Sequence, residues 1–591
     1  MSFYYENRTH TLQARPWKNV KLIHQTIQEV YLARAQNDAS RSIFYSRKGD
    51  GSWGGMCGQE WEEKARCLAG ALEARGFRQG DRAALFAYNS PEWYVFDFAI
   101  QLLGGIAVPV YMNAIASQAG QVLSDSGAKF VVVDTSERAE IAQAGAPEVV
   151  RIDLTGQCGD DCQESLNDLM AEGTPLETPA QVHSADIVTL SYTSGTTGES
   201  KGVMLTHENV LFIMETMSSL LPPISEEILV SYLPLAHIAQ RMADWTGIFY
   251  GAQMYFAPSI EEVLPTIEDV RPTSLVMVPR VLEKIREQIE ARVEEGSRVG
   301  QWIYRHAVQW AQESSRRKVR EEPLGPRVSF CWKLGDRLLY SKVRGRLGGR
   351  VRQILVGGAA LSSTLGEYFS GMGIPIYEIY GLTETAAPIT VGYEGAVDYR
   401  TVGKVIPGGE VRIAEDGEVI YRGPNLFRGY WNRPQETAEV LSQGWFRTGD
   451  LGKLDERGYL WVTGRKKELI CTAGGKNIAP LPIEASIASH SLVDQVMVIG
   501  DERPYLVALV TLSEIGLNRS DEELDVALAG HVDSVNRDLP RVEQIKKYKV
   551  LKTNFTVEAG DLTPTMKLKR PQIQEKYQAD IEEIYRDPGS L

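Results

Sequence analysis

The sequence SYTSGTTGESKG, residues 191–202, says more about fold and chemistry than any other stretch of the chain. It contains six Ser/Thr hydroxyls, three glycines and one lysine, and apolar runs flank it on both sides. Glycine permits positive φ and close approach of the backbone, while hydroxyls, backbone N–H groups and a lysine can donate to phosphate oxygens. A solvated linker has a similar composition, but the concentration of donors favours a loop that binds a polyphosphate.

The flanks of this loop distinguish it from the P-loop of ordinary NTPases. A P-loop has Gly directly before its Lys and Ser or Thr directly after it, whereas here Ser200 precedes Lys201 and Gly202 follows it. Residues 187–190 and 203–205 both have the composition of strands, so the loop is predicted to join two strands. No helix dipole then points at the phosphates, and the hydroxyls and the backbone must bind them.

Six further motifs follow, and with residues 192–202 they resemble the adenylate-forming enzymes: acyl-CoA synthetases, luciferases and peptide-synthetase adenylation domains. The motifs are LPLAH (233–237), GGAAL (357–361), YGLTE (380–384), WFRTGD (445–450), GRKK (464–467) and LTPTMK (562–567). The residues in several of these motifs are most similar to those of the long-chain fatty acyl-CoA synthetases. The resemblance implies an N-terminal adenylation domain, residues 1–465, that binds ATP and the acyl group, and a small mobile α+β lid domain, residues 466–591, that carries the catalytic lysine.

Composition limits the classes of function. The chain has 591 residues, enough for more than one domain, and its net charge of −14 argues against nucleic-acid binding. Basic clusters at 316–320 and 342–352 are interpreted as solvated helix faces, with contact to anionic lipid or to the phosphates of coenzyme A as the alternative. The six cysteines include a CxxxC pair, Cys158 and Cys162, without a second pair at zinc-site spacing, so free thiols in a reducing cytosol are expected.

No targeting or membrane segment is evident from the sequence. The N-terminus lacks a basic flank followed by an apolar core, so no signal peptide is expected. The longest apolar region, residues 93–116, is interrupted by Asp97, Gln101 and Pro109, which argues against a membrane span.

The order of hydrophobic patterns predicts an α/β fold. Strand-like runs at 83–87, 106–110 and 130–134 alternate with helical patterns at 61–75 and 117–126, which indicates two α/β layers with largely parallel sheets. From Val411 onward, short strands and tight turns indicate a β-rich subdomain. Further strands are expected at 274–278, 353–357, 495–499 and 506–510.

Residues 282–347 are charged and have helical spacing. We expect a helical insertion whose aromatic residues pack on the body of the domain, with a membrane-facing or acyl-tunnel role as the alternative. The aromatic residues are Trp302, Trp310, Trp332 and Tyr340.

The resemblance implies a reaction in two steps. A carboxylate attacks the α-phosphate of ATP to give an acyl-AMP and pyrophosphate, and a thiol then displaces AMP. Positioning and charge stabilisation can carry both steps without a protein nucleophile.

By the same resemblance, several motifs bind the nucleotide. Glu384 would coordinate Mg²⁺ with Thr196 as a second ligand, since this hard cation prefers oxygen, and Thr383 would touch the α-phosphate. Asp450, expected in a turn, would accept the ribose hydroxyls, and Arg465 would anchor ribose or α-phosphate. The adenine would stack on Tyr380 next to Gly381, with Gly358, Ala359 and Ala360 on its other side. The β- and γ-phosphates would be cradled by Thr193, Ser194, Gly195, Thr196, Thr197, Gly198 and Lys201.

The remaining assignments concern catalysis and domain movement. Lys567 matches the catalytic lysine of the family, whose ammonium stabilises the charge that builds up during adenylation, although Lys569 and Arg570 lie close to it in sequence. His237 would lie between the nucleotide and acyl sites, with a purely structural role as the alternative. Lys467 would be the hinge, and Gly474 and Gly475 would line the channel for coenzyme A.

We therefore expect a cytoplasmic long-chain fatty acid–CoA ligase that uses a fatty acid, ATP, coenzyme A and Mg²⁺ and binds no nucleic acid. One alternative is a ligase that passes acyl-AMP to a carrier protein. Another, of a different class, is a non-catalytic sensor of acyl groups or nucleotides. Peripheral contact with the inner membrane face and a homodimer are both consistent with the sequence, which does not define the preferred chain length.

Overall fold

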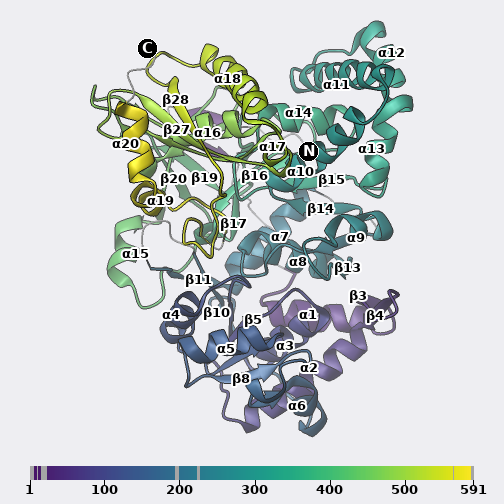
Figure 1. Cartoon of the computed structure of the whole chain (residues 1–591). Coiled ribbons are helices and arrows are strands. Elements are labelled where there is room, and N and C mark those ends of the chain that lie inside the picture. Colours follow the sequence, from purple (N-terminus) through teal and green to yellow (C-terminus); the bar gives the residue numbers. More distant parts are fainter. Residues whose placement is uncertain are drawn as a thin grey trace.

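The computed structural model describes the backbone of residues 5–8 and 11–14, and residues 23–193, 199–221, 226–563 and 565–586 with their side chains. Three large sheets build the N-terminal part of the chain, and a smaller domain with its own sheets follows it (Figure 1). The predicted fold class, a large α/β N-terminal domain with a separate α+β C-terminal domain, is confirmed.

The first sheet has seven strands, in the order β11-β10-β6-β5-β7-β8-β9, and all neighbours except β10 and β11 run parallel. Its central strands are continuous apolar runs because both faces are buried: alternate residues of β5 and β7 enter two different hydrophobic clusters. The strands are β5 (Arg82–Phe86), β6 (Ile106–Pro109), β7 (Phe130–Val133), β8 (Val150–Asp153), β9 (Glu164–Ser165), β10 (Ile187–Tyr192) and β11 (Gly202–Thr206). The accompanying helices are α2 (Gly58–Ala74), α3 (Pro91–Leu102), α4 (Ala116–Ser126), α5 (Ser136–Gly145) and α6 (Leu166–Glu172).

The second sheet has nine strands, in the order β18-β17-β16-β15-β14-β12-β13-β3-β4. Its middle strands are parallel, so their carboxyl ends lie along one edge, where ligands bind in open α/β sheets. The strands are β3 (Ser42–Arg47), β4 (Trp53–Cys57), β12 (Ile228–Ser231), β13 (Gln253–Phe256), β14 (Ser274–Met277), β15 (Gln353–Val356), β16 (Ile376–Leu382), β17 (Ala387–Val391) and β18 (Lys404–Val405). The helices are α1 (Ile27–Asn37), α7 (His207–Leu220), α8 (Ile238–Tyr250), α9 (Val263–Val270) and α14 (Ser363–Gly371).

The predicted helical insertion is present. It consists of α10 (Pro279–Glu294), α11 (Arg298–Val319), α12 (Gly325–Gly335), a π-helical turn (Asp336–Tyr340) and α13 (Ser341–Arg346), at the upper right of Figure 1. Tyr340 is fully buried and Trp310 and Trp332 are half-buried, but Trp302 is exposed, so the prediction that all these aromatics pack inward is wrong for Trp302. Among the described residues, no helix is both long and apolar enough to cross a bilayer.

The predicted β-rich subdomain is the third sheet. It contains β1 (Tyr5–Arg8), β2 (Thr11–Ala14), β19 (Glu410–Ile413), β20 (Glu418–Arg422), β21 (Leu441–Ser442), β22 (Trp445–Leu454) and β23 (Leu460–Arg465), with α15 (Pro434–Val440) beside it. The N-terminal hairpin β1–β2 joins this sheet through β19, a pairing across almost 400 residues that the sequence did not reveal.

The C-terminal domain has two hydrophobic clusters of its own. A three-stranded sheet forms its centre, with β26 antiparallel and β28 parallel to β27. Its elements are β24 (Ile470–Cys471), β25 (Asn477–Ile478), α16 (Pro480–Ala488), β26 (Val493–Ile499), β27 (Leu506–Leu512), α17 (Glu514–Leu517), α18 (Asp521–Arg537), β28 (Ile545–Leu551), α19 (Arg570–Lys576) and α20 (Gln578–Arg586).

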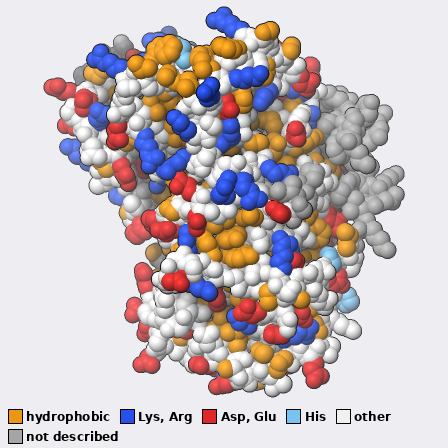
Figure 2. Space-filling model, turned by 90° about the vertical axis from the view of Figure 1, so that its right-hand side faces the viewer, with side chains coloured by type: hydrophobic (Ala, Val, Ile, Leu, Met, Phe, Trp, Pro, Cys, Tyr) orange, Lys and Arg blue, Asp and Glu red, His pale blue; other side chains and the backbone are white. Residues whose placement is uncertain are grey.

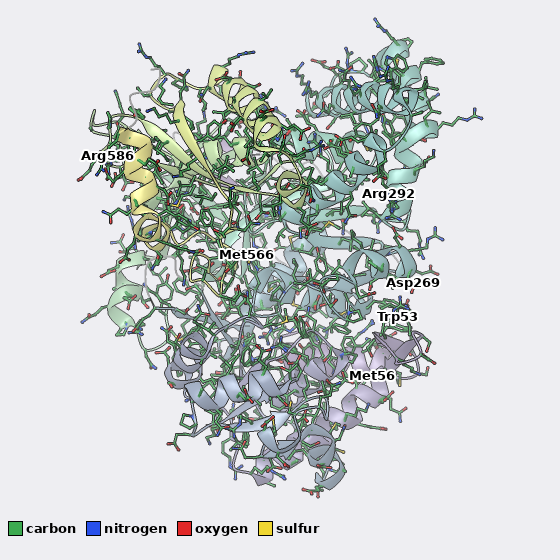
Figure 3. The ribbon with its side chains drawn as sticks, viewed as in Figure 1. Trp53, Met56, Asp269, Arg292, Met566 and Arg586 are labelled. Atoms are coloured by element: carbon green, nitrogen blue, oxygen red, sulfur yellow. The ribbon has the colours of Figure 1, made fainter. Side chains whose placement is uncertain are left out.

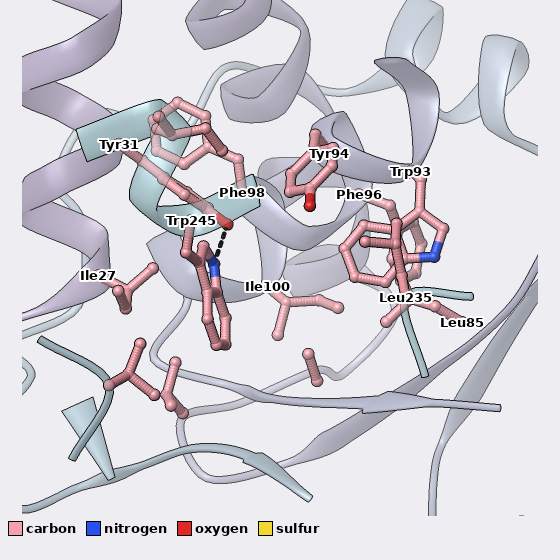
Figure 4. Close-up of a cluster of buried hydrophobic side chains, with 14 of the residues drawn as sticks. Ile27, Tyr31, Leu85, Trp93, Tyr94, Phe96, Phe98, Ile100, Leu235 and Trp245 are labelled. Carbon is pink, nitrogen blue, oxygen red and sulfur yellow. Dashed lines mark hydrogen bonds between the residues drawn. The ribbon is translucent and has the colours of Figure 1, made fainter. Parts of the chain in front are cut away.

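A buried polar network ties the two α/β layers together. The guanidinium of Arg241 on α8 pairs with Asp97 on α3 at 2.8 Å and donates to the hydroxyl of Thr189 on β10 at 3.0 Å. Tyr31 donates to Asp97 at 2.6 Å and accepts from the indole of Trp245 at 2.6 Å, the dashed contact in Figure 4. These bonds join α1, α3, α8 and β10, the strand that leads into the residue 193–201 loop.

Candidate active site

Three of the sequence motifs meet at the carboxyl edge of the second sheet. His237 follows β12, Gly358 follows β15, and Glu384 follows β16. A Cβ placed on Gly358, whose φ is +83°, would lie 3.8 Å from Nε2 of His237. Gly358, Ala359 and Ala360 are all exposed, so these small residues leave open surface beside the imidazole.

His237 has a defined orientation because it caps α8. Its Nδ1 accepts a hydrogen bond from the backbone N–H of Ala239 at 3.2 Å, so the neutral ring carries its proton on Nε2, next to Gly358. Burial, with a smaller contribution from the charge of Lys567, lowers the pKa of His237 to about 4. The ring is therefore a neutral hydrogen-bond donor at physiological pH.

The residue 193–201 loop is closed by its neighbouring strands. β10 and β11 are antiparallel with Tyr192 opposite Gly202, and the N–H of Thr193 donates to the carbonyl of Lys201 at 3.1 Å. The expectation that this loop joins two strands is confirmed. Ser194, Gly195, Thr196, Thr197 and Gly198, the centre of the predicted phosphate cradle, lie outside the described residues.

Tyr430 connects this loop to the predicted metal ligand. Its hydroxyl donates to Oε1 of Glu384 at 2.8 Å, and the ammonium of Lys201 lies 5.0 Å from the centre of its ring. Lys201 also forms an ion pair with Glu436. Sequence reasoning missed Tyr430, because its place beside β11 comes from the non-local bridge between Val203 and Tyr430.

The backbone around Glu384 is tightly constrained. Thr383 and Glu384 form a short helical turn (Thr383–Thr385), after which Ala386 and Ala387 adopt φ of 48° and 86°, uncommon for residues with a Cβ. The Thr385 hydroxyl bonds the carbonyls of Leu382 and Ala387 at 3.0 and 2.8 Å.

Two further residues hold this turn. The buried amide of Asn425 donates to the carbonyl of Thr385 at 2.7 Å. A Cβ on Gly381 would overlap the carbonyl oxygen of Ala387, so glycine is required there for packing. Strain held in this way keeps the carboxylate of Glu384 in place.

Asp450 is the centre of a second cluster. It accepts a 2.6 Å hydrogen bond from the hydroxyl of Tyr380 and forms an ion pair with Nε of Arg465 at 2.9 Å. Burial raises the pKa of Asp450, and Arg465 opposes that rise. The structure thus brings together the predicted adenine and ribose residues.

The local structure at Asp450 differs from the prediction of a turn. The residue lies inside β22, where the pairing with β20 shifts between Arg447 and Leu451 and Gly449 adopts φ +73°. The extra residues form a bulge, which re-aims a side chain without ending the strand.

Lys567 comes from the C-terminal domain, and its charge interacts with Glu384 and with the Asp450–Arg465 pair. Desolvation by the surrounding protein and the charge of Arg465 lower its pKa, while Asp450, Glu468 and Glu384 oppose this. Figure 3 labels Met566, the preceding residue, where the C-terminal domain meets the rest of the molecule.

Lys567 lies in a tight loop. Met566 has φ +61°, and Thr563 closes the loop: its N–H donates to the carbonyl of Lys567 at 2.8 Å, and its hydroxyl accepts from the Lys567 N–H at 3.1 Å. The neighbouring cation Arg570 is occupied, because it pairs with Glu484 at 2.6 Å. The geometry therefore favours Lys567 over Arg570 as the cation of the site.

The residue predicted as the hinge and the glycines predicted to line the coenzyme A channel lie in different surroundings. Lys467 is exposed in the turn Lys466–Glu468, and Lys466 pairs with Asp416 at 2.6 Å and Glu418 at 3.2 Å. Gly474 and Gly475 are exposed between β24 and β25, and within the described part of the chain no recorded interaction joins them to Lys567 or His237. The structure thus brings several residues of the predicted adenylation site together, and among the described residues no recorded contact ties the predicted channel glycines to them.

Comparison of this sequence with known proteins assigns the chain to a family. Residues 33–431 match the AMP-binding enzyme family, and residues 467–588 match the AMP-binding enzyme C-terminal domain. The chain belongs to the AMP-binding enzymes. It is 35% identical over 93% of its length to the long-chain-fatty-acid–CoA ligase FadD15 of Mycobacterium bovis, of which it covers 95%. It is 30% identical over 96% of its length to ACSBG2, a long-chain-fatty-acid–CoA ligase of Xenopus laevis, of which it covers 84%.

Two solved structures show a similar fold. The adenylation domain of a carboxylate reductase from Mycobacterium chelonae superposes with a TM-score of 0.78 at 22% identity, covering 96% of this chain and 92% of that one. O-succinylbenzoate coenzyme A synthetase from Bacillus subtilis, in complex with ATP and magnesium, has a TM-score of 0.70 at 24% identity, covering 92% and 99%.

Proposed function

We propose that this AMP-binding enzyme is a long-chain fatty acid–CoA ligase, which forms an acyl-AMP and then a fatty acyl-CoA. The observation that carries the proposal is the position of Lys567: the charge of this cation, on the C-terminal domain, acts on His237, Asp450 and Glu384 of the N-terminal domain. The names of the two relatives, both long-chain-fatty-acid–CoA ligases, support the substrate class.

In the first step, a carboxylate oxygen of the fatty acid bonds to the α-phosphorus of ATP and the bond to the β-phosphate breaks, releasing pyrophosphate. Lys567 and Thr383 stabilise the charge that develops on the α-phosphate, and the Nε2–H of His237 donates to the incoming carboxylate. Tyr380 and the open surface of Gly358, Ala359 and Ala360 hold adenine. Asp450 and Arg465 orient ribose, and Thr193, the 194–198 segment and Lys201 hold the departing phosphates.

Glu384 fits a magnesium ion, because a buried carboxylate oxygen is a hard ligand and the side-chain hydrogen bond that it accepts comes from a neutral hydroxyl, that of Tyr430. The remaining ligands would be phosphate oxygens and Thr196. When bound, Mg²⁺ would withdraw charge from the phosphates and so assist the departure of pyrophosphate.

The second step needs a different arrangement of the domains. We place the boundary at residues 465/466 and the hinge at Lys467, so that rotation withdraws Lys567 and brings Gly474 and Gly475 to the acyl-AMP. The thiol of coenzyme A then bonds to the acyl carbon and AMP leaves. We place the enzyme in the cytoplasm, with peripheral contact to a membrane.

The test of the first step is fatty-acid-dependent exchange of pyrophosphate into ATP. Lys567→Ala should lower the exchange rate by about 10²- to 10³-fold, the usual loss when one charge-stabilising group is removed, while ATP binding changes little. Lys569→Ala is the matched control and should retain exchange. Equal rates in the Lys567→Ala variant and the parent would remove Lys567 from the mechanism.

Product analysis separates the alternatives. Acyl-CoA formed with coenzyme A as the sole acceptor supports the ligase, and acyl-AMP that accumulates until a carrier protein is added would support the carrier-protein alternative. Ligand binding without any exchange would indicate a sensor.

A further inference from the structure

The outer face of α12 and the π-helical turn after it carries exposed apolar and basic residues in alternation. Five of the fourteen exposed large hydrophobic residues in the described part of the chain lie between 299 and 338. Three of them recur at helical spacing: Phe330, Leu334 and Leu338 are 69%, 40% and 38% exposed. Arg327, which precedes them, and Lys333 and Arg337, which lie between them, are exposed as well. We call these six residues the α12 outer face.

The opposite side of the same helical segment is firmly attached to the protein. The indole of Trp332 donates to the carbonyl of Gly371 at 2.7 Å, and Tyr340 donates to the carbonyl of Ala307 at 2.6 Å. Arg344 donates to the carbonyl of Met372 at 2.7 Å. The helix is therefore held by its inner side, and Phe330, Leu334 and Leu338 are not needed for that packing.

Several cations of the neighbouring helices are paired: Arg316 with Glu367 at 2.9 Å, Arg317 with Glu313 at 2.7 Å, and Arg344 with Asp336 at 2.6 Å. By contrast, Arg327, Lys333 and Arg337 make no recorded ion pair with the residues that the structure describes. Residues 298–346 contain twelve Lys/Arg and four Asp/Glu, whereas the whole chain has a net charge of −14.

Figure 2 looks onto the side of the molecule where α11, α12 and α13 lie. Hydrophobic and basic side chains gather over the upper part of this side. An anionic surface would repel the acidic protein as a whole and attract this region, so charge complementarity determines which side can approach it. An apolar helical stripe flanked by Lys and Arg is the pattern of a helix that lies in a membrane interface.

We propose that the α12 outer face docks on an anionic lipid bilayer. Phe330, Leu334 and Leu338 enter the boundary between headgroups and acyl chains, and Arg327, Lys333 and Arg337 contact lipid phosphates. The reason for such docking rests on the proposed function, since long-chain fatty acids partition into bilayers, but the docking itself does not depend on turnover.

The test is co-flotation with vesicles of phosphatidylcholine, alone and mixed with phosphatidylglycerol, at low and physiological salt. The parent should bind the mixed vesicles more tightly, and salt should weaken binding. Lys333→Glu with Arg337→Glu should lower affinity at least about tenfold. Phe330→Ser with Leu334→Ser should also lower it at least several-fold. The matched control is Leu517→Ser with Arg519→Glu, an exposed apolar residue and cation on the C-terminal domain, which should bind like the parent.

Turnover of a short, water-soluble fatty acid in the absence of vesicles should be the same in all variants, so a loss of docking is distinguished from a loss of the ligase activity. Failure of the parent to bind mixed vesicles, or equal binding by all variants, would overturn the proposal. A fall in the solution mass of the protein in the α12 variants, with vesicle binding unchanged, would overturn it in favour of an interface between two copies of the chain.

Discussion

Two arginine–aspartate pairs of this molecule have the same chemistry and opposite surroundings. Arg241 and Asp97 lie within the N-terminal domain with side chains only 1% and 0% exposed. Arg280 on α10 and Asp494 on β26 join the two domains with 35% and 20% exposure. A buried pair cannot be separated without leaving a charge in a medium of low polarity, whereas water readily replaces an exposed one.

The difference fits a fixed N-terminal scaffold and a C-terminal domain that we propose to move. Arg241 is also enclosed by aromatic rings, with Trp93 and Trp245 centred 5.1 and 4.3 Å from its guanidinium carbon, and its helix begins directly after His237. Arg280 has two further carboxylates within reach, Glu283 at 3.3 Å and Glu287 at 3.5 Å, so it has partners when Asp494 leaves. The first pair fixes the scaffold, and the second suits a contact that opens in the domain rotation that we propose.

The largest effect is expected from breaking the buried pair. Asp97→Ala leaves Arg241 charged and uncompensated, and the protein should lose about 3–5 kcal/mol of unfolding free energy. Asp97→Asn retains hydrogen-bonding atoms and should cost less. Urea denaturation followed by fluorescence measures both, and a loss below about 1 kcal/mol for the alanine variant would contradict the role assigned to the pair.

The next prediction tests whether the scaffold holds His237 as a neutral hydrogen-bond donor. Because its pKa is about 4, the ring stays neutral from pH 5.5 to 8, and its protonation should not shape the rate of adenylation in that range. His237→Ala should lower pyrophosphate exchange by about 10²-fold, the scale expected for one positioned donor. A rate in the parent that falls with a midpoint near pH 6.5, and does not do so in the alanine variant, would show that the ring is not buried as described.

Glu378 on β16 differs from both arginine–aspartate pairs, because its carboxyl group is buried without a recorded cation beside it in the described part of the chain. Among the described residues, the only recorded hydrogen bond to its carboxyl group comes from the N–H of Leu361 at 3.3 Å, and the nearby Tyr399 is also buried. Burial raises the pKa of Glu378 to about 8. The folded state thus holds this proton more tightly than the unfolded state, and the stability from the protonated form is lost as pH rises toward 8.

Glu378→Gln should therefore stabilise the protein relative to the parent as pH rises from 5 to 8, by up to about 1.4 kcal/mol per pH unit. Thermal midpoints measured at pH 6 and pH 8.5 give the comparison. A difference between variant and parent that does not grow with pH would mean that Glu378 is not a protonated, unpaired carboxyl in the folded protein.

The smallest effect is expected at the domain contact. Arg280→Asp should weaken the arrangement in which Lys567 faces the proposed nucleotide residues, by less than about 1 kcal/mol, so pyrophosphate exchange falls up to about fivefold. Thioester formation from added acyl-AMP should not fall. Combining Arg280→Asp with Asp494→Arg should restore exchange.

The matched control for this contact is Arg316→Asp, which breaks an exposed 2.9 Å pair with Glu367 inside the N-terminal domain and should leave the ratio of the two half-reactions unchanged. If the Arg280 and Arg316 variants behave alike, the interdomain pair does not bias the domain arrangement.

Local sequence was sufficient for much of this molecule. The strands β5, β6, β7 and β10, the helix α2 and the strand–loop–strand form of the 193–201 segment follow from hydrophobic runs and from glycines and hydroxyls between them. The motifs also indicated the family. Each of these features depends on neighbours within a few residues, which is the range over which side-chain spacing determines backbone structure.

Tertiary structure alone decided the rest, because the interactions join residues far apart in the chain. The bulge that aims Asp450 depends on pairing between β20 and β22, and Tyr430 reaches Glu384 only because its segment lies beside β11. The approach of Lys567 to His237 spans two domains. The sequence determined which groups this protein has for its chemistry, and long-range packing of sheets and domains decided which of them meet.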